Sequence, residues 1–436
     1  MSIKVRVSSD FHTLSVSAIC SICLFSSAAA ATNPLKSYNV DPTQISVSGI
    51  SAGGYMAQQF HVAFSSTIMG AGIIAGGPYY CAENTVNRAM TVCSAYGEKY
   101  FGQKYVGPPS SADVDKLVTY TRNQSGKTID PIASLQAGRV FMFSGSNDRT
   151  VPTDIMDALK DYYDKIGVTN VHYVKGLPAG HAQIIREDYP TFDANDCGTS
   201  DPPYINECET AFPPAQKGDA DLAGSILKFI YGSLDSPQKS THEAIEFDQA
   251  EFAGGAPNNI GLDEKGYLYV PNACADDGVS CKLHVAFHGC HQGKNQAPEG
   301  NSSKYVKYAG YNEWAEQNNI IVLYPQVFPS PNPNGCWDWW GQAYTDASYA
   351  NKSGKQMAAV KAMINRVAKI GEVEQCFTTD NPTHVANSRA YACGLFGLWA
   401  CAQGSDDDLD LNFFFITTSL KQTGPGSWTK VANCPQ

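Results

Sequence analysis

Charged side chains are scarce in this sequence, and basic ones are scarcer than acidic ones. Asp, Glu, Lys and Arg make up 17% of the 436 residues, and the 31 Lys and Arg face 42 Asp and Glu, which gives a formal charge of −11. Binding to nucleic acid or to an anionic membrane requires clustered Lys and Arg that neutralise phosphate groups. The composition therefore argues against both partners and favours a neutral one.

The sequence also lacks a long apolar run beyond its first 31 residues. Within residues 1–31, Lys4 and Arg6 precede the apolar stretch Leu14–Phe25, and the small residues Ala28–Ala31 follow it. This order is typical of a secretory signal peptide, which is removed from the mature protein. The apolar stretch is short and contains serines, so a transmembrane anchor is a weaker interpretation. We therefore predict a secreted, extracellular protein.

No Cys-x-x-Cys spacing remains once the signal segment is removed, because the pair with that spacing is Cys20 and Cys23. We therefore expect no metal site built on this motif. Of the 14 cysteines, twelve remain after these two are subtracted, and an even number in an exported chain predicts disulfides. The expected pairs are Cys81–Cys93, Cys197–Cys208, Cys274–Cys281 and Cys290–Cys336. The pairing stays open for the last four cysteines, Cys376, Cys393, Cys401 and Cys434.

The stretch Ile45–Ala63 contains the strongest local motif. A β-prone run, Ile45–Ser48, meets Gly49-Ile50-Ser51-Ala52-Gly53 and continues into a helical pattern. A Gly-x-Ser-x-Gly motif between a strand and a helix is the nucleophile elbow of α/β-hydrolases, in which glycines permit a sharp turn that exposes the serine hydroxyl. The motif also occurs in ordinary loops. Ser51 is therefore a candidate nucleophile that requires catalytic partners.

Candidate partners for Ser51 follow two later strand signals. Asp148 follows the strand predicted at 139–143, and His181 follows the strand predicted at 171–174. In α/β-hydrolases the acid and the histidine come after the serine in this order, each in a loop at the C-terminal end of a strand. His181 would be the general base, and Asp148 would orient its ring. Three further carboxylates compete for the acid role: Asp154, Asp193 and Asp196.

The second half of the chain carries an element in an unusual position. A strand predicted at 283–287 ends in His288-Gly289-Cys290, and in α/β-hydrolases such a strand builds the oxyanion loop and precedes the nucleophile. Here it follows His181, and a helix predicted at 304–317 comes after it. The sequence therefore predicts a circularly permuted α/β-hydrolase, with a mostly parallel sheet flanked by helices. In that fold the strand at 283–287 should neighbour the strand before Ser51.

Several stretches between Ser46 and Gly341 are specific when taken together. They include SVSGISAGGYMAQQ, AGGPYYCA, FSGSNDRTV, LHVAFHGC and NPNGCWDWWG. With these stretches the chain resembles the extracellular poly(3-hydroxybutyrate) depolymerases of the single-domain, circularly permuted type. The resemblance extends to about Ile370, and so covers most of the mature chain.

The resemblance implies a secreted serine esterase that hydrolyses poly(3-hydroxybutyrate) to oligomers and monomers through an acyl-enzyme, without a cofactor. It also implies the triad Ser51, Asp148 and His181. The backbone N–H groups of Ala52 and Cys290 would form the oxyanion hole, and Trp337 and Trp339 would lie beside the substrate. Two alternatives stay open: a secreted carboxylesterase acting on feruloyl or acetyl esters of polysaccharides, and a catalytically silent secreted binding protein.

Three histidines near the oxyanion loop have a structural interpretation. His288 and His291 flank Gly289 and Cys290, where the backbone turn rather than the imidazole ring is needed. His284 lies within the predicted strand and is interpreted as a core residue. We therefore expect none of the three to be a metal ligand.

The C-terminal residues 372–436 lie outside the catalytic resemblance. They contain four cysteines and the run Phe413-Phe414-Phe415, which predict a small β-rich, disulfide-closed appendage. The predicted organisation is a signal peptide at 1–31, a catalytic domain at 32–371 and this appendage, in a protein that we expect to be monomeric. Polymer binding is one hypothesis for the appendage, and packing against the catalytic domain is the other.

Overall fold

The computed structural model describes residues 33–186, 193–208, 220–276, 278–296, 303–371, 376–424 and 427–434. The signal peptide predicted at 1–31 lies outside these residues. None of the helices in the described part of the chain combines the length and the apolar character that a bilayer crossing requires.

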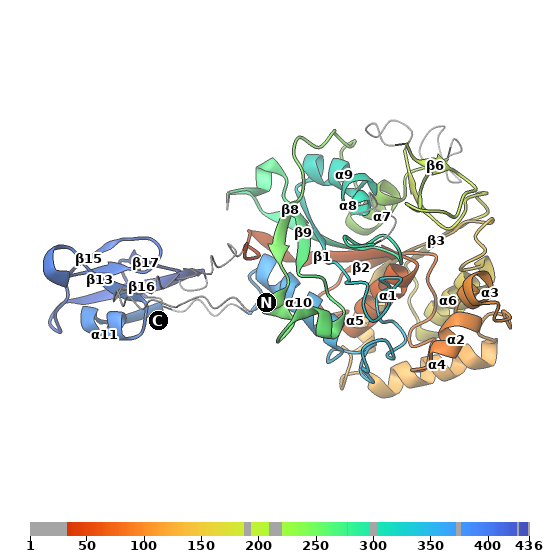
Figure 1. Ribbon diagram of the computed structural model, residues 1–436, viewed down its shortest axis with the longest axis horizontal. Helices are drawn as coiled ribbons and strands as arrows, with labels where there is room; N and C mark the ends of the chain where they lie inside the picture. Colours follow the sequence, from red (N-terminus) through yellow and green to blue (C-terminus); the bar gives the residue numbers. More distant parts are fainter. Residues whose placement is uncertain are drawn as a thin grey trace, which may run out of the picture. The chain divides into compact units, whose positions relative to one another are not determined.

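An eight-stranded sheet lies at the centre of the fold (Figure 1), in the order β4-β3-β2-β1-β10-β11-β9-β8. Its strands are β1 Val40–Ile50, β2 Gly70–Ile74, β3 Arg139–Ser144, β4 Val171–Lys175, β8 Ile245–Asp248, β9 Lys265–Tyr269, β10 Cys281–Phe287 and β11 Ile320–Tyr324. Pairing is parallel from β4 to β11, and β9 and β8 add an antiparallel edge. The prediction of a mostly parallel sheet is confirmed.

Strand β1 runs parallel to β10, with Ile45 opposite Leu283 and Gly49 opposite Phe287. The prediction that the strand at 283–287 neighbours the strand before Ser51 is therefore confirmed. The central strands β2 and β11 are buried along their whole length, as expected for parallel strands covered on both faces. The carboxyl ends of β1 and β10 consequently meet at one edge of the sheet.

Helices cover both faces of this sheet, and the apolar core consists of two clusters, one on each face. The first contains apolar residues of α1 Ala52–Ala63, α4 Ser111–Gln124, α6 Thr153–Ile166 and α10 Lys355–Val367. The second contains those of α7 Leu222–Tyr231 and α9 Tyr311–Asn318. Successive residues of a strand point to opposite faces, so Val285 belongs to the first cluster and Ala286 to the second.

Shorter elements complete the main part of the fold. They are the helices α2 Val86–Thr91, α3 Tyr96–Phe101, α5 Ile132–Gln136 and α8 Lys304–Tyr308, and the small strands β5 Gln183–Ile185, β6 Asn195–Asp196 and β7 Ile205–Glu207. The single helix predicted at 304–317 is wrong, because the structure has α8 and α9 in its place. Gly310 separates them with a φ of +88°, a left-handed conformation that ends one helix before the next begins.

The described residues of 376–434 form two three-stranded antiparallel sheets, one short α-helix and the 3-10 turn Leu395–Gly397. The elements are β12 Cys376–Asp380, α11 Asn381–Ala386, β13 Ala390–Cys393, β14 Trp399–Ala402, β15 Asp408–Leu411, β16 Thr417–Gly424 and β17 Ser427–Val431. Their apolar core has six buried residues, of which three are alanines: Ala390, Ala400, Ala402, Leu409, Leu420 and Trp428. Disulfides join Cys376 to Cys434 and Cys393 to Cys401, which resolves the pairing that the sequence left open.

Candidate active site

Ser51 occupies the turn between β1 and α1. Its φ of +58° and ψ of −125° lie in a region that residues with a side chain rarely adopt. The Ser51 N–H donates to the Ile74 carbonyl at 2.9 Å, and the Ser51 carbonyl accepts from the Tyr55 N–H at 3.0 Å. These bonds hold the turn in its strained form, which costs on the order of 1–3 kcal/mol and is typical of functional sites.

Gly53 explains how the oxyanion loop comes close to Ser51. A Cβ atom at Gly53 would lie 2.2 Å from the Phe287 carbonyl oxygen and 2.5 Å from that of His288. Only glycine therefore allows α1 to approach the end of β10. On the loop that follows, a Cβ at Gly289 would lie 3.3 Å from the Ser51 Cβ, so the space between the loop and the serine has no room for a further side chain.

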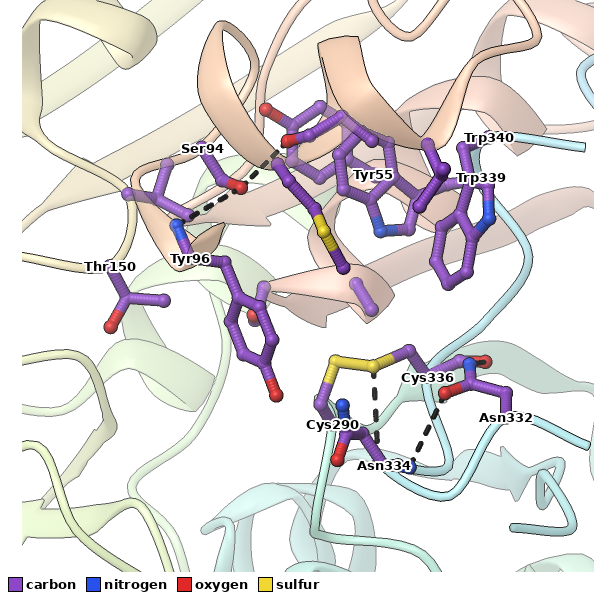
Figure 2. A pocket seen from close by; sticks show the side chains of 16 residues that line it. Tyr55, Ser94, Tyr96, Thr150, Cys290, Asn332, Asn334, Cys336, Trp339 and Trp340 are labelled. Atoms are coloured by element: carbon purple, nitrogen blue, oxygen red, sulfur yellow. Dashed lines mark hydrogen bonds between the residues drawn. A yellow bond between two sulfur atoms is a disulfide. The ribbon is translucent and has the colours of Figure 1, made fainter. Parts of the chain in front are cut away.

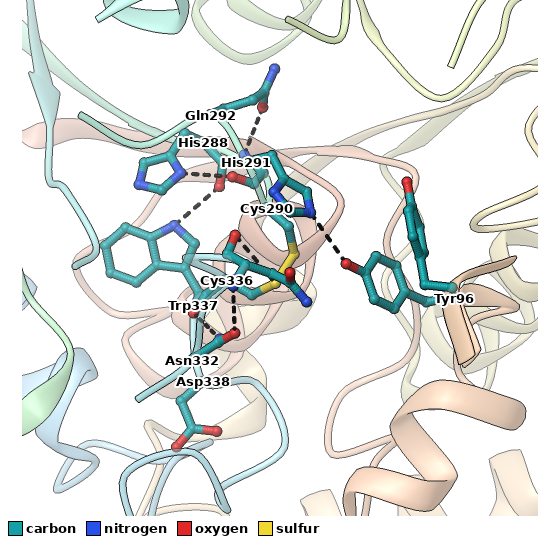
Figure 3. The surroundings of a disulfide bond; sticks show 12 residues. Tyr96, His288, Cys290, His291, Gln292, Asn332, Cys336, Trp337 and Asp338 are labelled. Carbon is teal, nitrogen blue, oxygen red and sulfur yellow. Dashed lines mark hydrogen bonds between the residues drawn. A yellow bond between two sulfur atoms is a disulfide. The ribbon is translucent and has the colours of Figure 1, made fainter. Parts of the chain in front are cut away.

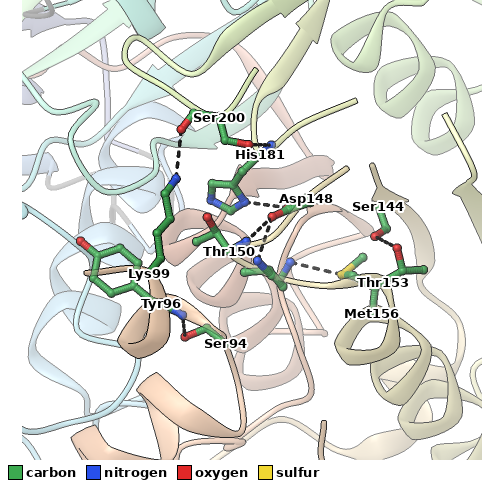
Figure 4. Close-up of polar contacts among 12 residues, drawn as sticks. Ser94, Tyr96, Lys99, Ser144, Asp148, Thr150, Thr153, Met156, His181 and Ser200 are labelled. Atoms are coloured by element: carbon green, nitrogen blue, oxygen red, sulfur yellow. Dashed lines mark hydrogen bonds and ion pairs between the residues drawn. The ribbon is translucent and has the colours of Figure 1, made fainter. Parts of the chain in front are cut away.

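Asp148 and His181 form a hydrogen-bonded pair beside this turn (Figure 4). Asp148 Oδ2 lies 2.7 Å from His181 Nδ1, and Asp148 Oδ1 accepts from the N–H groups of Thr150 at 2.8 Å and Val151 at 2.9 Å. The carboxylate is thus fixed by its own loop. With Nδ1–H donating to it, the neutral ring has Nε2 free to accept a proton. Of the four candidate acids, Asp148 is the one bonded to His181.

The loop that carries His181 is held by residues of a small disulfide-closed segment. The His181 N–H donates to Ser200 Oγ at 2.8 Å, and the Gly180 N–H donates to the Cys197 carbonyl at 2.8 Å. Cys197 is bonded to Cys208. The predicted Cys81–Cys93 and Cys274–Cys281 disulfides are also present. The Cys197–Cys208 bridge therefore supports the position of the histidine.

Ser51 lies between two cavities. The smaller cavity encloses about 290 Å³ and brings Ser51 and His181 together with Ile50, Tyr96, Tyr100, Thr150, Tyr204, Gly289, Cys290, His291 and Gln292. The larger cavity encloses about 550 Å³ and is mainly apolar (Figure 2). Besides Ser51 it is lined by Ala52, Tyr55, Val86, Ala89, Met90, Ser94, Tyr96, Thr150, Val151, Cys290, Asn332, Asn334, Cys336, Trp339 and Trp340.

The predicted tryptophans have different positions. Trp339 lines the larger cavity and stacks on Tyr55 with ring centroids 3.8 Å apart, and Trp340 lines the same cavity. Trp337 is 0% exposed, and its indole N–H donates to the His288 carbonyl at 3.1 Å. The ring of Trp337 is therefore buried against the oxyanion loop and does not face the cavity, contrary to the expectation that it contacts substrate. It supports the loop instead.

The oxyanion loop is tied to the segment that precedes the tryptophans (Figure 3). Cys290 is bonded to Cys336, as predicted, and the His291 N–H donates to the Asn334 carbonyl at 2.8 Å. The Gly289 N–H is already engaged with Gln292 Oε1 at 2.8 Å. The next N–H, that of Cys290, belongs to a residue that lines both cavities.

Ala52 is the first residue of α1, so its N–H has no acceptor within that helix. The positive end of the helix dipole also lies at this position, beside Ser51. Ala52 follows Ser51 in the chain and Cys290 lines both cavities with it, so the two backbone N–H groups stay the candidates for an oxyanion hole.

The other histidines of this region are paired within the protein. His288 is fully buried with Nδ1 2.8 Å from the Gly289 carbonyl, and burial lowers its pKa to about 4. His284 lies 2.7 Å from the hydroxyls of both Ser46 and Ser48, and burial lowers its pKa to about 3. His291 differs, because it lines the smaller cavity. No group of three or more potential metal ligands is found among the described residues.

Sequence reasoning missed much of the cavity wall. Tyr96 and Thr150 line both cavities, and Met90 and Asn332 line the larger one. Thr150 and Asn332 lie within the stretches FSGSNDRTV and NPNGCWDWWG, but nothing in those stretches assigns either residue to a cavity wall. They come from segments that only the tertiary fold brings together. For Tyr96 and Met90 the available signal is the predicted Cys81–Cys93 pairing, which indicates an ordered segment in this part of the chain.

A serine in a strained strand–helix turn, facing an Asp–His pair at the carboxyl edge of a mainly parallel sheet, defines the class of this protein. It is a serine hydrolase with an α/β fold, and the family follows from comparison with known proteins.

No protein-family model matches the sequence. A poly(3-hydroxybutyrate) depolymerase of Delftia acidovorans is 39% identical over 394 residues, which cover 88% of this chain and 72% of that protein. A polyhydroxybutyrate depolymerase of Talaromyces funiculosus is 36% identical over 357 residues, covering 78% of this chain and 94% of that protein. The chain therefore belongs to the poly(3-hydroxybutyrate) depolymerase family.

Solved structures agree with this assignment. A crystal structure of PHB depolymerase from Penicillium funiculosum has a TM-score of 0.64 and 34% identity, and covers 77% of this chain and 99% of that one. A PHB depolymerase complexed with an R3HB trimer gives the same values. A probable acetylxylan esterase of Aspergillus terreus is 37% identical over 98 residues, which is 22% of this chain and 26% of that protein.

Proposed function

We propose that this protein hydrolyses the ester bonds of poly(3-hydroxybutyrate) outside the cell, releasing oligomers and monomers. The observation that carries the proposal is the position of Ser51 between a large apolar cavity and the Asp148–His181 pair. An uncharged aliphatic polyester suits an aromatic wall such as that of Trp339. Membership of the depolymerase family supports the same substrate.

In the proposed reaction Ser51 Oγ attacks the ester carbonyl carbon while His181 Nε2 takes the hydroxyl proton. The oxyanion that forms accepts hydrogen bonds from the N–H groups of Ala52 and Cys290. The carbon–oxygen bond then breaks, and His181 returns the proton to the leaving 3-hydroxyl oxygen. A water molecule, deprotonated by His181, hydrolyses the acyl-Ser51 ester and regenerates the enzyme, without a cofactor.

Export from the cell is part of the proposal. Six disulfides join all twelve cysteines that lie outside residues 1–31, which suits an oxidising compartment. We further propose that residues 1–31 are removed as a signal peptide and that the mature protein is a monomer. Mass determination of the secreted protein and light scattering test the two statements.

We also propose that the order of the strands along the chain is a circular permutation of the usual α/β-hydrolase order. In the usual order the strand with the His-Gly loop precedes the nucleophile strand, whereas here β10 follows β1 while lying next to it. A variant that joins the two ends of the catalytic domain and opens the chain before β8 should fold and retain esterase activity.

Residues 372–436 are proposed to be a separate appendage that adsorbs to the polymer. Two neighbouring loops, joined by the bond from the Asn412 N–H to the Leu398 carbonyl at 2.8 Å, expose large apolar side chains. These side chains are Leu395, Phe396, Leu398, Trp399, Phe413, Phe414 and Phe415. An exposed apolar patch of this kind is typical of an interaction surface.

Clearing of suspended polymer granules, with chromatography of the released acids, tests the main proposal. Ser51→Ala should abolish clearing, since loss of the nucleophile typically costs several orders of magnitude in kcat. A serine-directed phosphonate should label Ser51 in the unsubstituted protein. Turnover of acetylated or feruloylated polysaccharide without granule clearing would favour the carboxylesterase instead, and failure of the phosphonate to react would favour a silent binding protein.

A further inference from the structure

The hydroxyl of Thr150 is an unpaired polar group in the wall of the active site. Thr150 is 4% exposed, and among the described residues its Oγ1 has no hydrogen-bond partner. A buried hydroxyl without a partner destabilises a folded protein, typically by about 1–3 kcal/mol. Such a group is therefore expected to have a partner that the protein alone does not supply.

The backbone on both sides of this hydroxyl is fixed. The Thr150 N–H donates to Asp148 Oδ1 at 2.8 Å, and the Thr150 carbonyl accepts from the Ala95 N–H at 2.9 Å. Thr150 is thus attached to the triad acid on one side (Figure 4) and, through its carbonyl, to the segment before Tyr96 on the other. Its side chain is held at the site and lines both cavities together with Ser51.

The phenolic hydroxyl groups of the smaller cavity already have neighbours. Tyr96 Oη lies 3.3 Å from His291 Nε2, and Tyr100 Oη lies 3.5 Å from Tyr204 Oη. These phenols can satisfy one another and the imidazole. Apart from Ser51 itself, Thr150 is consequently the residue of this wall whose side-chain hydroxyl has no hydrogen-bond partner among the described residues.

The position of His181 shows which part of a substrate passes Thr150. His181 lines the smaller cavity, and it must reach the leaving oxygen to protonate it. The unit that leaves therefore lies on the side of His181 and Thr150. In a 3-hydroxyalkanoate chain the leaving unit carries its own ester or acid carbonyl, separated from the leaving oxygen by two carbon atoms. A simple alkyl or aryl ester has no such carbonyl.

We propose that Thr150 is a substrate-positioning residue whose hydroxyl donates a hydrogen bond to the carbonyl oxygen of the leaving unit. This inference rests on the proposed function and adds the feature by which the site distinguishes a 3-hydroxyacid polyester from a simple ester. A leaving unit that is a plain phenol or alcohol has no carbonyl oxygen to accept this hydrogen bond. The contribution of the Thr150 hydroxyl to kcat/KM should then disappear.

The test compares Thr150→Val and Thr150→Ser on two substrates, an R3HB trimer and phenyl butyrate. Thr150→Val keeps the side-chain shape and removes the hydroxyl. It should lower kcat/KM for the trimer about three- to tenfold, as expected for loss of one neutral hydrogen bond, and change that for phenyl butyrate less than about twofold. Thr150→Ser should restore the trimer activity. Tm of Thr150→Val should be unchanged or higher, because no internal bond is lost.

Thr121→Val is the matched control. Thr121 is also buried, but its hydroxyl donates to the Leu117 carbonyl at 2.8 Å and lies 2.9 Å from the Tyr162 hydroxyl. This substitution should lower Tm and leave the ratio of the two activities unchanged. Equal losses on both substrates for Thr150→Val would overturn the inference and leave the proposed function standing. An unsubstituted protein that hydrolyses phenyl butyrate but not the trimer would overturn the proposed function itself.

Discussion

The main part of the protein, 33–371, and the C-terminal part, 376–434, both bury some polar side chains, but they differ in how fully they expose aromatic rings. The main part buries polar groups such as His284 and Glu313, whereas the C-terminal part leaves Phe396 90% exposed and Phe414 79% exposed. Buried polar groups cost stability, and a large apolar core can offset that cost. Exposed aromatic rings in a small fold indicate instead a surface that serves binding.

Disulfides have correspondingly different tasks in the two parts. The C-terminal core has few large side chains, and chains below about 70–80 residues rarely obtain enough stability from a single core. Its two disulfides are therefore expected to be necessary for folding. In the main part, Cys290–Cys336 joins two loops on top of an extensive core, so it is expected to position the active site more than to stabilise the fold.

The largest effect should come from breaking the Cys376–Cys434 bond. Its cysteines are 58 residues apart, and loss of a loop closure of this size costs about 4 kcal/mol in the chain-entropy account. Cys376→Ser with Cys434→Ser should unfold the C-terminal part at a temperature at which the main part stays folded. Limited proteolysis followed by mass spectrometry measures this. Equal protection of both parts in the variant would contradict the contrast drawn between them.

Cys336→Ser should act mainly on turnover. An oxyanion donor contributes on the order of 2.7–4 kcal/mol, and misplacing the Cys290 N–H should forfeit part of this, so kcat should fall about tenfold or more while KM changes little. The Trp337 bond to the His288 carbonyl keeps the loop nearby. Kinetics measured well below the melting temperature distinguish positioning of the oxyanion donor from stabilisation of the fold. Unchanged kcat with a lowered Tm would show that the bridge only stabilises the fold, by roughly 2–4 kcal/mol.

The sequence was informative where the signals are local. The strand–turn–helix around Ser51 and the strands before Asp148 and His181 follow from neighbouring residues, and these are the elements that form the site. The sequence does not distinguish Trp337 from Trp339, since which of the two rings faces a cavity depends on tertiary contacts: Trp337 packs on Phe287, whereas Trp339 stacks on Tyr55. Thr150 lies within the stretch FSGSNDRTV, but the sequence assigns it no role, because its significance arises from the absence of a partner within the described fold.

The buried carboxyl of Glu313 should make the stability of the main part depend on pH. Glu313 is 3% exposed, and burial, with a smaller effect of the charge on Asp221, raises its pKa from 4.5 to about 7. Between these values the folded state holds a proton that the unfolded state has released, so the free energy of unfolding falls as pH rises.

Glu313→Gln removes this dependence. Relative to the unsubstituted protein, its free energy of unfolding should rise by on the order of 1.4 kcal/mol per pH unit from about pH 5 to pH 7, and then level off. Denaturant titrations at several pH values measure the difference. A difference that stays constant across this range would show that Glu313 is not protonated in the folded state.

The smallest expected effect concerns the exposed aromatic side chains of the C-terminal part. Phe413 and Phe415 stack with centroids 5.4 Å apart, beside the loop that carries Phe396. If about 50 Å² of a ring is covered by polymer, about 1.2 kcal/mol of binding energy results, so Phe396→Ser and Phe414→Ser should each weaken adsorption to granules several-fold. Hydrolysis of soluble oligomers should not change. Val106→Ser, at an exposed apolar residue of the main part, is the control and should adsorb normally. Normal adsorption of both phenylalanine variants would contradict a role of these exposed rings of the C-terminal part in polymer binding.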